Sequence, residues 1–228
     1  MRVRCARARV VAVSPTTATF SPPHSLRSWL AYAKAAGNGK RVTSVNMTWA
    51  VPAFPTTRGG GNAPGWWWGF EPVPALDLLQ PILAYGDGSP DYTIFNGEYD
   101  WNNGDWWMSN TATVLPGDVI FSTTQYDAAT DSYTLTIANT NRTGHVISSV
   151  RSGKKQLYTD VYVVVEHQPN SCSEYPASGG IVFYDISIAW NGQVASAPQW
   201  SAQTFKPACN SKAAVISSSS VGFTWDTA

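Results

Sequence analysis

The feature that most constrains the fold of this chain is the run of three tryptophans from Trp66 to Trp68. Neighbouring side chains of a strand point to opposite faces, so three adjacent rings cannot all enter one core. We predict a strand with Trp66 and Trp68 on one face and Trp67 on the other. A second apolar run, Leu78 to Leu83, follows after a turn and contains the amide Gln80. Two apolar surfaces are therefore expected here, and one of them is a candidate binding surface.

The rest of the chain has the pattern of an all-β protein. Alternation of apolar and polar residues predicts strands over 42–49 and 159–167, and Asn102-Asn103-Gly104 predicts a hairpin between two further strands. Pro81 indicates that the strand over 78–85 lies at a sheet edge or contains a bulge. Residues 192–211 show no period and are expected to be irregular. These short strands with turn signals between them predict an antiparallel β-sandwich of two large sheets, a lectin-like (concanavalin A-like) jelly roll.

The N-terminal part has a different pattern. Residues 25–36 place Leu26, Leu30 and Ala33 at helical spacing before Gly37, which predicts a short helix. We therefore expect a poorly ordered segment with that helix over residues 1–40, and a single sandwich domain over 41–228.

Composition narrows the class of partner. The chain has 15 basic and 15 acidic residues among 228, so its formal net charge is zero, unlike the basic footprint of a nucleic-acid binder. No apolar run is long enough to span a membrane. Three separated histidines and the lack of a C-x-x-C pair predict neither a metal site nor a cofactor. The expected partner is thus neither a nucleic acid nor a membrane, and we expect a monomer.

Two sets of residues bear on the cellular compartment. Cys172 and Cys209 both lie in the C-terminal third and are candidates for a disulfide. Asn46 and Asn141 begin glycosylation sequons, which matter only on a secretory route. The N-terminus lacks the apolar core of a secretory signal.

Two side chains are candidates for chemistry. Glu166 shares a predicted strand face with Tyr162 and Val164, where partial burial would raise its pKa and suit it to general acid–base work. The alternative is a carboxylate at a strand end that meets solvent. Gln80 offers a donor and an acceptor that can orient water or stabilise an oxyanion, and its alternative is a core glutamine that satisfies backbone groups.

An aromatic cluster, Tyr99-Asp100-Trp101 with Trp106-Trp107, is a candidate groove lining. Its alternatives are sandwich core or a face on which carbohydrate stacks.

Several short motifs together resemble the eqolisin family of fungal glutamic peptidases. They are Thr48-Trp49-Ala50-Val51-Pro52, Trp68-Gly69-Phe70-Glu71, Leu79-Gln80, Tyr99-Asp100-Trp101, Pro116-Gly117-Asp118-Val119-Ile120 and Val163-Val164-Val165-Glu166. The order and spacing agree from about residue 42 to 225. The resemblance implies a lectin-like β-sandwich, extracellular location, and hydrolysis of polypeptides at acid pH without a cofactor.

The resemblance also implies residue roles. Glu166 would be the general base that activates water and then the acid toward the leaving amine, while Gln80 would orient the water and stabilise the oxyanion. Trp68 and the cluster Tyr99-Asp100-Trp101 would line the substrate groove, and Glu71 would support it in place of a family Asp.

Two other functions remain open from the sequence. One is a non-catalytic, carbohydrate- or surface-binding sandwich that keeps the aromatic groove. The other is a glycoside hydrolase that pairs Glu98 or Asp100 with Glu166, which requires the two carboxyl groups to flank one bond. The presence of both Gln80 and Glu166 favours the peptidase, and it predicts that the two side chains face each other across one groove, close enough to share a water.

Overall fold

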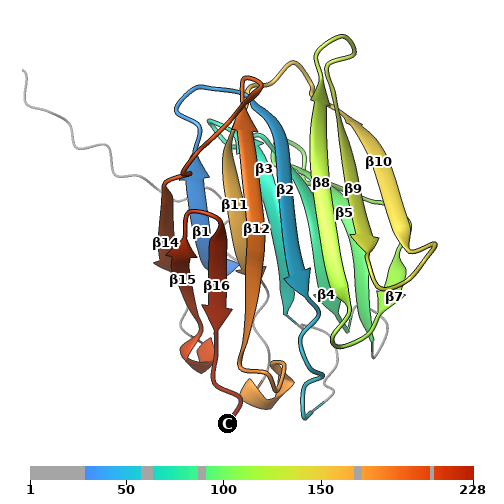
Figure 1. Ribbon diagram of the computed structural model, residues 1–228, viewed down its shortest axis with the longest axis vertical. Helices are drawn as coiled ribbons and strands as arrows, with labels where there is room; N and C mark the ends of the chain where they lie inside the picture. The colour runs from blue at the N-terminus through green and yellow to red at the C-terminus, as the bar shows by residue number, and fades with distance from the viewer. Residues whose placement is uncertain (1–28, 58–63, 87–90, 167–170, 206–207) are drawn as a thin grey trace, which may run out of the picture.

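Two antiparallel sheets pack face to face in the computed structural model, which describes residues 29–57, 64–86, 91–166, 171–205 and 208–228 (Figure 1). The first sheet, sheet A, consists of β1 (Trp29–Ala36), β3 (Gly65–Pro72), β4 (Asp77–Tyr85), β5 (Tyr92–Asp100), β6 (Asp105–Met108), β7 (Ala112–Val114), β11 (Tyr158–Glu166) and β14 (Trp200–Thr204). Its strand order is β14-β1-β11-β3-β4-β5-β6, and β7 also pairs with β5.

The second sheet, sheet B, lies in front of sheet A in Figure 1. It consists of β2 (Val42–Ala50), β8 (Val119–Asp127), β9 (Ser132–Asn139), β10 (Val146–Ser152), β12 (Gly180–Trp190), β13 (Gln193–Val194), β15 (Lys212–Ser217) and β16 (Ser220–Thr224). Its order is β10-β9-β8-β2-β12-β16-β15, and β13 pairs with β12. The predicted fold class, an antiparallel sandwich of two large sheets, is confirmed.

The tryptophan run alternates between two surfaces, as predicted. Trp66 and Trp68 belong to the large core between the sheets. Trp67 belongs to a second apolar cluster on the opposite face of sheet A, together with Trp29, Leu78, Ile82, Phe95 and Val164. We call this side of sheet A, which faces away from sheet B, the outer face. All three rings are buried, so β3 is covered on both sides.

The predicted N-terminal helix is wrong over Trp29–Ala36, which is a strand between β11 and β14. Ala31, Ala33 and Ala35 face the inter-sheet core, whereas Tyr32 and Lys34 alternate with them on the outer face. Alanine favours helices in isolation, but pairing with two neighbouring strands overrides that preference. The sandwich thus begins no later than residue 29, and residues 25–28 lie outside the described ranges.

Two further predictions about strands need correction. Residues 192–211 are not wholly irregular, because they include β13 and β14. The strand that contains Pro81 is not at an edge, because β4 lies between β3 and β5. Its ladder with β3 is interrupted between the pairs Trp67↔Ile82 and Phe70↔Leu79, at the point where Pro81 has no N–H to donate.

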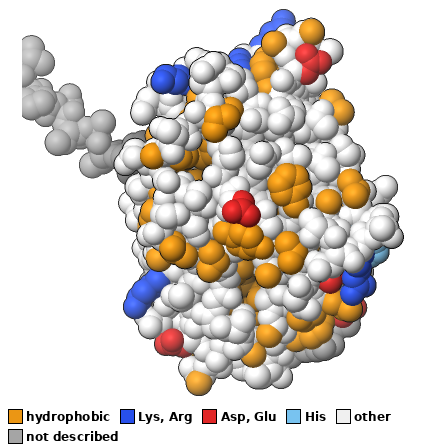
Figure 2. Space-filling model, in the orientation of Figure 1, with side chains coloured by type: hydrophobic (Ala, Val, Ile, Leu, Met, Phe, Trp, Pro, Cys, Tyr) orange, Lys and Arg blue, Asp and Glu red, His pale blue; other side chains and the backbone are white. Residues whose placement is uncertain are grey.

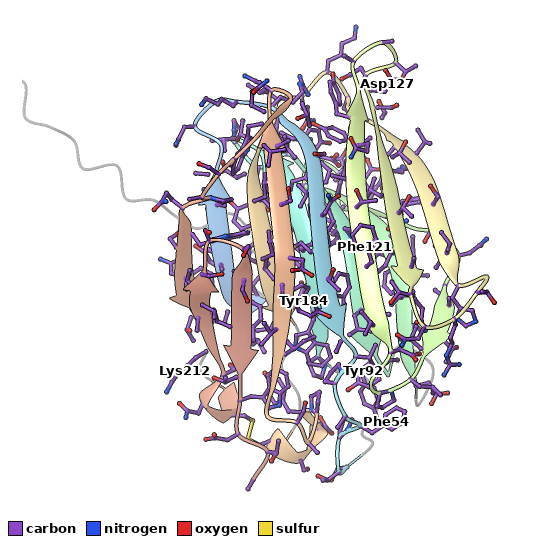
Figure 3. The ribbon with its side chains drawn as sticks, viewed as in Figure 1. Phe54, Tyr92, Phe121, Asp127, Tyr184 and Lys212 are labelled. Carbon is purple, nitrogen blue, oxygen red and sulfur yellow. A yellow bond between two sulfur atoms is a disulfide. The ribbon has the colours of Figure 1, made fainter. Side chains whose placement is uncertain are left out.

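One end of the sandwich is fixed by a disulfide and by stacked rings. The predicted disulfide between Cys172 and Cys209 is present, and it joins the 3₁₀ turns η2 (Cys172–Glu174) and η3 (Ala208–Asn210) (Figure 3). At the same end Phe54 stacks on Tyr92 with ring centroids 5.6 Å apart, and the Tyr92 hydroxyl donates to the Ala53 carbonyl.

The face of sheet B that points away from sheet A shows no concentration of charges of one sign. In Figure 2 the lysine and arginine side chains lie at the rim of this face, and apolar side chains are scattered between polar ones. Among the described residues no helix has the length and apolar character needed to cross a membrane.

Candidate active site

The candidate residues lie on three adjacent strands of sheet A: β11, β3 and β4. Across β11 and β3 the facing pairs are Glu166↔Gly65, Val164↔Trp67, Tyr162↔Gly69 and Asp160↔Glu71. Across β3 and β4 they include Gly65↔Ala84 and Trp67↔Ile82, which sets Gln80 opposite Gly69. Because side chains two residues apart share a face, Gln80 and Glu166 both lie on the outer face.

The register separates these two residues along the strands. Glu166 lies at the level of Ala84, four residues from Gln80, which corresponds to roughly 13 Å along the strands and about 10 Å across them. Trp67, Val164 and Ile82 occupy the row between them. Gln80 and Glu166 are therefore at diagonal corners of one patch, and their backbones are not directly opposite. This register does not support the prediction that the two side chains face each other closely enough to share a water.

Gln80 occupies a narrow slot between two glycines. A Cβ atom added at Gly69 would lie 2.7 Å from the Leu79 carbonyl oxygen and 3.1 Å from the Gln80 Cβ. On the other side, a Cβ added at Gly97 would lie 2.4 Å from the Trp106 ring. The two glycines thus allow the strands and the Trp106 ring to approach the amide closely.

The Gln80 amide is buried but incompletely bonded. Only 4% of the residue is exposed, and its Oε1 has no hydrogen-bond partner among the described residues. An orphaned amide oxygen costs free energy in a folded protein. Other buried polar atoms of the described residues, among them Asn96 Oδ1, also lack a partner, so the role of Gln80 stays a prediction.

Glu166 is half-buried at the end of β11. Its Oε2 accepts a hydrogen bond of 2.8 Å from Trp67 Nε1. The Trp67 ring is held in turn by an edge contact with Trp29, with centroids 5.1 Å apart. The carboxylate is therefore directed by a rigid aromatic pair, and it does not simply extend into solvent.

Beyond Gln80 the outer face carries a buried group of charges. Glu71 faces Asp160, and Lys34 forms an ion pair with Asp160 at 2.5 Å. Burial raises the pKa of Glu71 to about 8; Lys34 opposes this rise, and Asp160 and Asp77 add to it. Glu71 is consequently a neutral carboxylic acid at acid pH, able to donate a hydrogen bond.

Aromatic rings line both sides of this patch. Tyr162 faces Gly69 and contacts Trp29 with centroids 5.4 Å apart. Tyr99 contacts Trp101 at 4.3 Å and Trp106 at 6.5 Å, on the β5–β6 side. Tyr99 and Trp101 therefore lie on the outer face, as do Gln80 and Glu166, and their role as a groove lining stays a prediction.

Two predicted groove residues are elsewhere. Trp68 points into the inter-sheet core and its Nε1 donates to Ser122 Oγ, so its prediction as a groove residue is wrong, and Trp67 holds the corresponding place on the outer face. Asp100 binds Lys154 in a charged cluster on the other side of sheet A.

That cluster explains why a glycoside hydrolase pair does not form. Lys154 Nζ lies 3.0 Å from Asp77, 2.7 Å from Glu98 and 2.9 Å from Asp100. Glu98 also pairs with Arg151 of β10 in sheet B. Both Glu98 and Asp100 thus lie on the inner side of sheet A and Glu166 on the outer face, which contradicts the hypothesis that they flank one glycosidic bond.

The two sequons lie in different surroundings. Asn46 is a half-buried residue of β2 whose Oδ1 accepts from Thr123, whereas Asn141 is exposed in a turn and its Oδ1 accepts from the Val119 N–H. Glycosylation at either position stays a prediction. No group of histidine, cysteine and acidic side chains in the described ranges is arranged to hold a metal ion.

Sequence reasoning missed Lys34 and Asp160 as neighbours of Glu71. Because residues 25–36 were interpreted as a helix, Lys34 was not placed on a strand. The alternation of Tyr32 and Lys34 with three alanines is the signal of a strand.

The comparisons with known proteins agree with this fold. No protein-family profile matches the sequence, and no curated protein matches it. Among solved structures, a scytalido-glutamic peptidase with a transition-state analogue inhibitor superposes with a TM-score of 0.62 at 19% identity, covering 87% of this chain and 98% of its own. SCP-B, a member of the eqolisin family solved with the tripeptide Ala-Ile-His, has a TM-score of 0.60 with the same identity and coverage. The chain has the β-sandwich fold of the eqolisin peptidases, and the predicted resemblance to that family is confirmed at the level of structure.

Proposed function

We propose that this protein is an acid endopeptidase that hydrolyses polypeptides with Glu166 and Gln80. The observation that carries the proposal is the shared outer face: a buried amide with an orphaned oxygen and a carboxylate held by Trp67 lie on one patch of a peptidase-like fold. A fold alone does not define a reaction, so the proposal depends on these two side chains.

The diagonal spacing suggests how the two groups divide the work. Two extended side chains leave a gap on the order of 7 Å between their ends, given strand spacing and residue rise. One water cannot bridge that gap with two hydrogen bonds of about 2.8 Å each, but a water and a peptide carbonyl in series can. Glu166 takes a proton from the water as it attacks the carbonyl carbon, and Gln80 Nε2 donates to the carbonyl oxygen.

The collapse of the tetrahedral intermediate completes the reaction. Glu166 returns the proton to the nitrogen of the leaving amine, the C–N bond breaks, and a carboxylic acid and an amine are released. Gln80 carries no titratable proton and does not compete with Glu166 for one, unlike the second carboxyl of an aspartic dyad. Glu71, neutral at acid pH, keeps the neighbourhood of Gln80 free of an added negative charge.

The proposed setting is extracellular, with a polypeptide substrate, a monomeric enzyme and no cofactor. The Cys172–Cys209 disulfide supports an oxidising compartment.

The kinetic test of the proposal is the Gln80→Ala variant, assayed on a denatured protein at acid pH. Loss of an oxyanion donor is expected to lower kcat by about 100-fold or more while KM changes little. Gln203→Ala, on the edge strand β14 of sheet A, is the matched control and should retain wild-type kcat. Equal kcat in both variants would remove Gln80 from the mechanism.

The alternative function is carbohydrate binding without catalysis. It is supported by Trp106, a residue that is 47% exposed beside Tyr99 and offers a ring on which a sugar can stack. Binding to a glycan array that Trp106→Ala abolishes, with no proteolysis by the wild type, would favour this function over the peptidase.

A further inference from the structure

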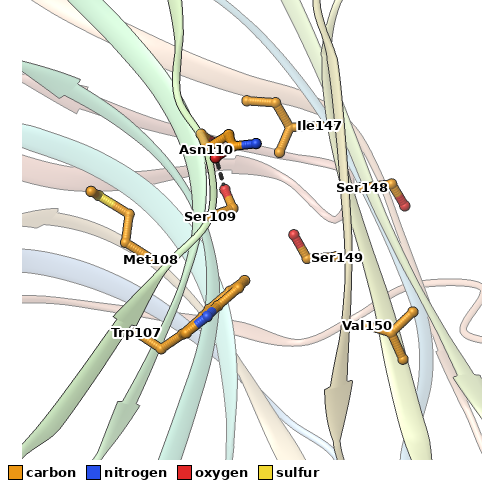
Figure 4. Close-up of a pocket in the computed structure, with 8 residues that line it drawn as sticks. All are labelled: Trp107, Met108, Ser109, Asn110, Ile147, Ser148, Ser149 and Val150. Atoms are coloured by element: carbon orange, nitrogen blue, oxygen red, sulfur yellow. Dashed lines mark hydrogen bonds between the residues drawn. The ribbon is translucent and has the colours of Figure 1, made fainter.

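A cleft of about 410 Å³ opens between the edge strands of the two sheets, on the side away from β14 and β15 (Figure 4). Its lining comes from the end of β6 and the residues after it on one wall, and from β10 on the other. The lining residues are Trp107, Met108, Ser109, Asn110, Ile147, Ser148, Ser149 and Val150. The volume lies within the range of sites that bind small molecules or peptide segments.

Both walls of the cleft are edges of sheets. In the described part of the chain β6 pairs only with β5, and β10 pairs only with β9. A strand edge presents a row of N–H and C=O groups that can pair with another extended chain. Four consecutive residues of β10, 147 to 150, line the cleft, which corresponds to roughly 13 Å of strand.

A buried amide at the base of the cleft fixes the distance between its walls. Asn96 of β5 donates from Nδ2 to the carbonyl oxygens of Leu135 and Ile147 and to Ser149 Oγ, at 3.2 to 3.4 Å. Its backbone N–H donates to Ser109 Oγ at 3.0 Å. These bonds connect both walls to one fully buried residue, so the cleft is a built feature of the fold.

The chemistry of the lining matches an extended polypeptide better than a charged ligand. Its side chains are hydroxyl, amide and apolar groups. Arg151, which follows the lining residues on β10, is already paired with Glu98 and lies over the Trp107 ring at 4.0 Å from its centroid. Uncharged polar groups beside a free strand edge favour main-chain pairing with a bound peptide.

The cleft lies beside the row of paired residues across β4, β5 and β6 that contains Gln80. The register places Gln80 beside Gly97, and Gly97 beside Met108 of the cleft wall. Two strand spacings, about 10 Å, therefore separate the candidate catalytic amide from the cleft. A polypeptide that is cleaved at Gln80 can reach the cleft with residues only a few positions from the scissile bond.

We propose that this cleft binds an extended segment of the polypeptide substrate, which adds as a strand to the free edge of β10. The inference rests on the proposed function, because it identifies the bound chain as the substrate. It makes the enzyme selective for unfolded chains that are long enough to occupy both the catalytic patch and the cleft. Folded proteins cannot supply such a strand, and peptides that span only the scissile bond do not reach it.

The test compares Ser149→Trp with Val146→Trp. Ser149 points into the cleft, so its indole fills the cleft (Figure 4). Val146 lies on the same strand, is exposed and does not line the cleft, so its indole controls for the effect of a tryptophan on an edge strand. The substrates are a reduced and carboxymethylated protein and a short peptide that spans only its cleavage site. Ser149→Trp is expected to lower kcat/KM for the protein by about tenfold, from the loss of a few main-chain hydrogen bonds, and to leave the short peptide unaffected. Val146→Trp should leave both unchanged.

A binding measurement separates failure of this inference from failure of the peptidase proposal. The Glu166→Gln variant, alone and combined with Ser149→Trp, is titrated with the fluorescein-labelled carboxymethylated protein and followed by anisotropy. Binding should weaken by about tenfold with Ser149→Trp even if no variant cleaves anything. If Ser149→Trp does not fold, Asn110→Trp at the exposed rim gives the same comparison. Equal affinity with and without the blocking tryptophan overturns the inference, whatever the catalytic result.

Discussion

Replacement of Glu71 by glutamine should change how the stability of this protein depends on pH. Glu71 is 4% exposed, and its burial raises the pKa from 4.5 to about 8. A carboxyl group whose pKa is higher in the folded state binds its proton more tightly there than in the unfolded state. Its contribution to stability is fully present below the unfolded pKa and is lost as the pH rises through the folded pKa. Between pH 4.5 and 8 the wild type should therefore become steadily less stable.

The magnitude follows from the two pKa values. At 1.36 kcal/mol per pKa unit, a pKa of about 8 against 4.5 corresponds to at most about 5 kcal/mol. Glutamine has nearly the same shape and no charge. Glu71→Gln should thus match the wild type below pH 4.5, and should exceed its free energy of unfolding by up to about 5 kcal/mol above pH 8.

Urea unfolding of the two proteins across this pH range is the assay. Asp185→Asn removes an exposed carboxylate of β12 and serves as the matched control, with a pH dependence like that of the wild type. Burial also raises the pKa of Asp77, to about 6. The free energy of unfolding of the Glu71→Gln protein should therefore still decrease as the pH rises, but by less than that of the wild type. Parallel curves for the wild type and Glu71→Gln at all pH values would refute the argument from burial.

Two further predictions concern packing and charge. Lys154→Met removes the cation shared by Asp77, Glu98 and Asp100 and should lower the free energy of unfolding by about 3 kcal/mol at neutral pH. The loss should be smaller at acid pH, because the carboxyl groups accept protons there. Lys155→Met, exposed in the same loop, is the control, and equal melting temperatures of the two variants would count against the cluster. Gly69→Ala should destabilise the protein by about 2 kcal/mol, and by more than Gly97→Ala does. The added Cβ at Gly69 would meet a backbone oxygen at 2.7 Å, whereas that at Gly97 would meet the Trp106 ring, which belongs to an exposed residue and can move. Chemical unfolding of both variants measures the two losses of stability, and a larger loss for Gly97→Ala would contradict the prediction.

The central strands could be predicted from the sequence because their patterns are local. Trp66 to Trp68 required alternate faces, and Asn102-Asn103-Gly104 required a tight turn, with Gly104 at φ +78°. Both are observed. Strand β1 could not be recognised, since its inward face is alanine, which is small enough for close sheet packing but favours helices in isolation. Strand β14, Trp-Ser-Ala-Gln-Thr, lacked an apolar alternation because it lies at an exposed edge.

The candidate site shows the same limit. Gln80 and Glu166 are 86 residues apart, and no local pattern could give the register that places them on one face, four residues apart along the strands. Trp68 was assigned to the groove from a motif, but the parity of β3 directs Trp67 there. The Lys154 cluster depends on contacts among β4, β5 and the loop after β10, which no periodicity reveals.

The most direct test of the peptidase proposal is the rate of peptide-bond cleavage by Glu166→Gln relative to the wild type. The substrate is a denatured protein at acid pH, with Glu174→Gln as a control for the loss of a carboxylate outside sheet A. Glutamine keeps an oxygen that can accept the hydrogen bond from Trp67 but cannot take a proton from water. Cleavage by Glu166→Gln should fall by at least about 1,000-fold, while Glu174→Gln should cleave at the wild-type rate. Cleavage by Glu166→Gln at the wild-type rate would contradict the peptidase proposal.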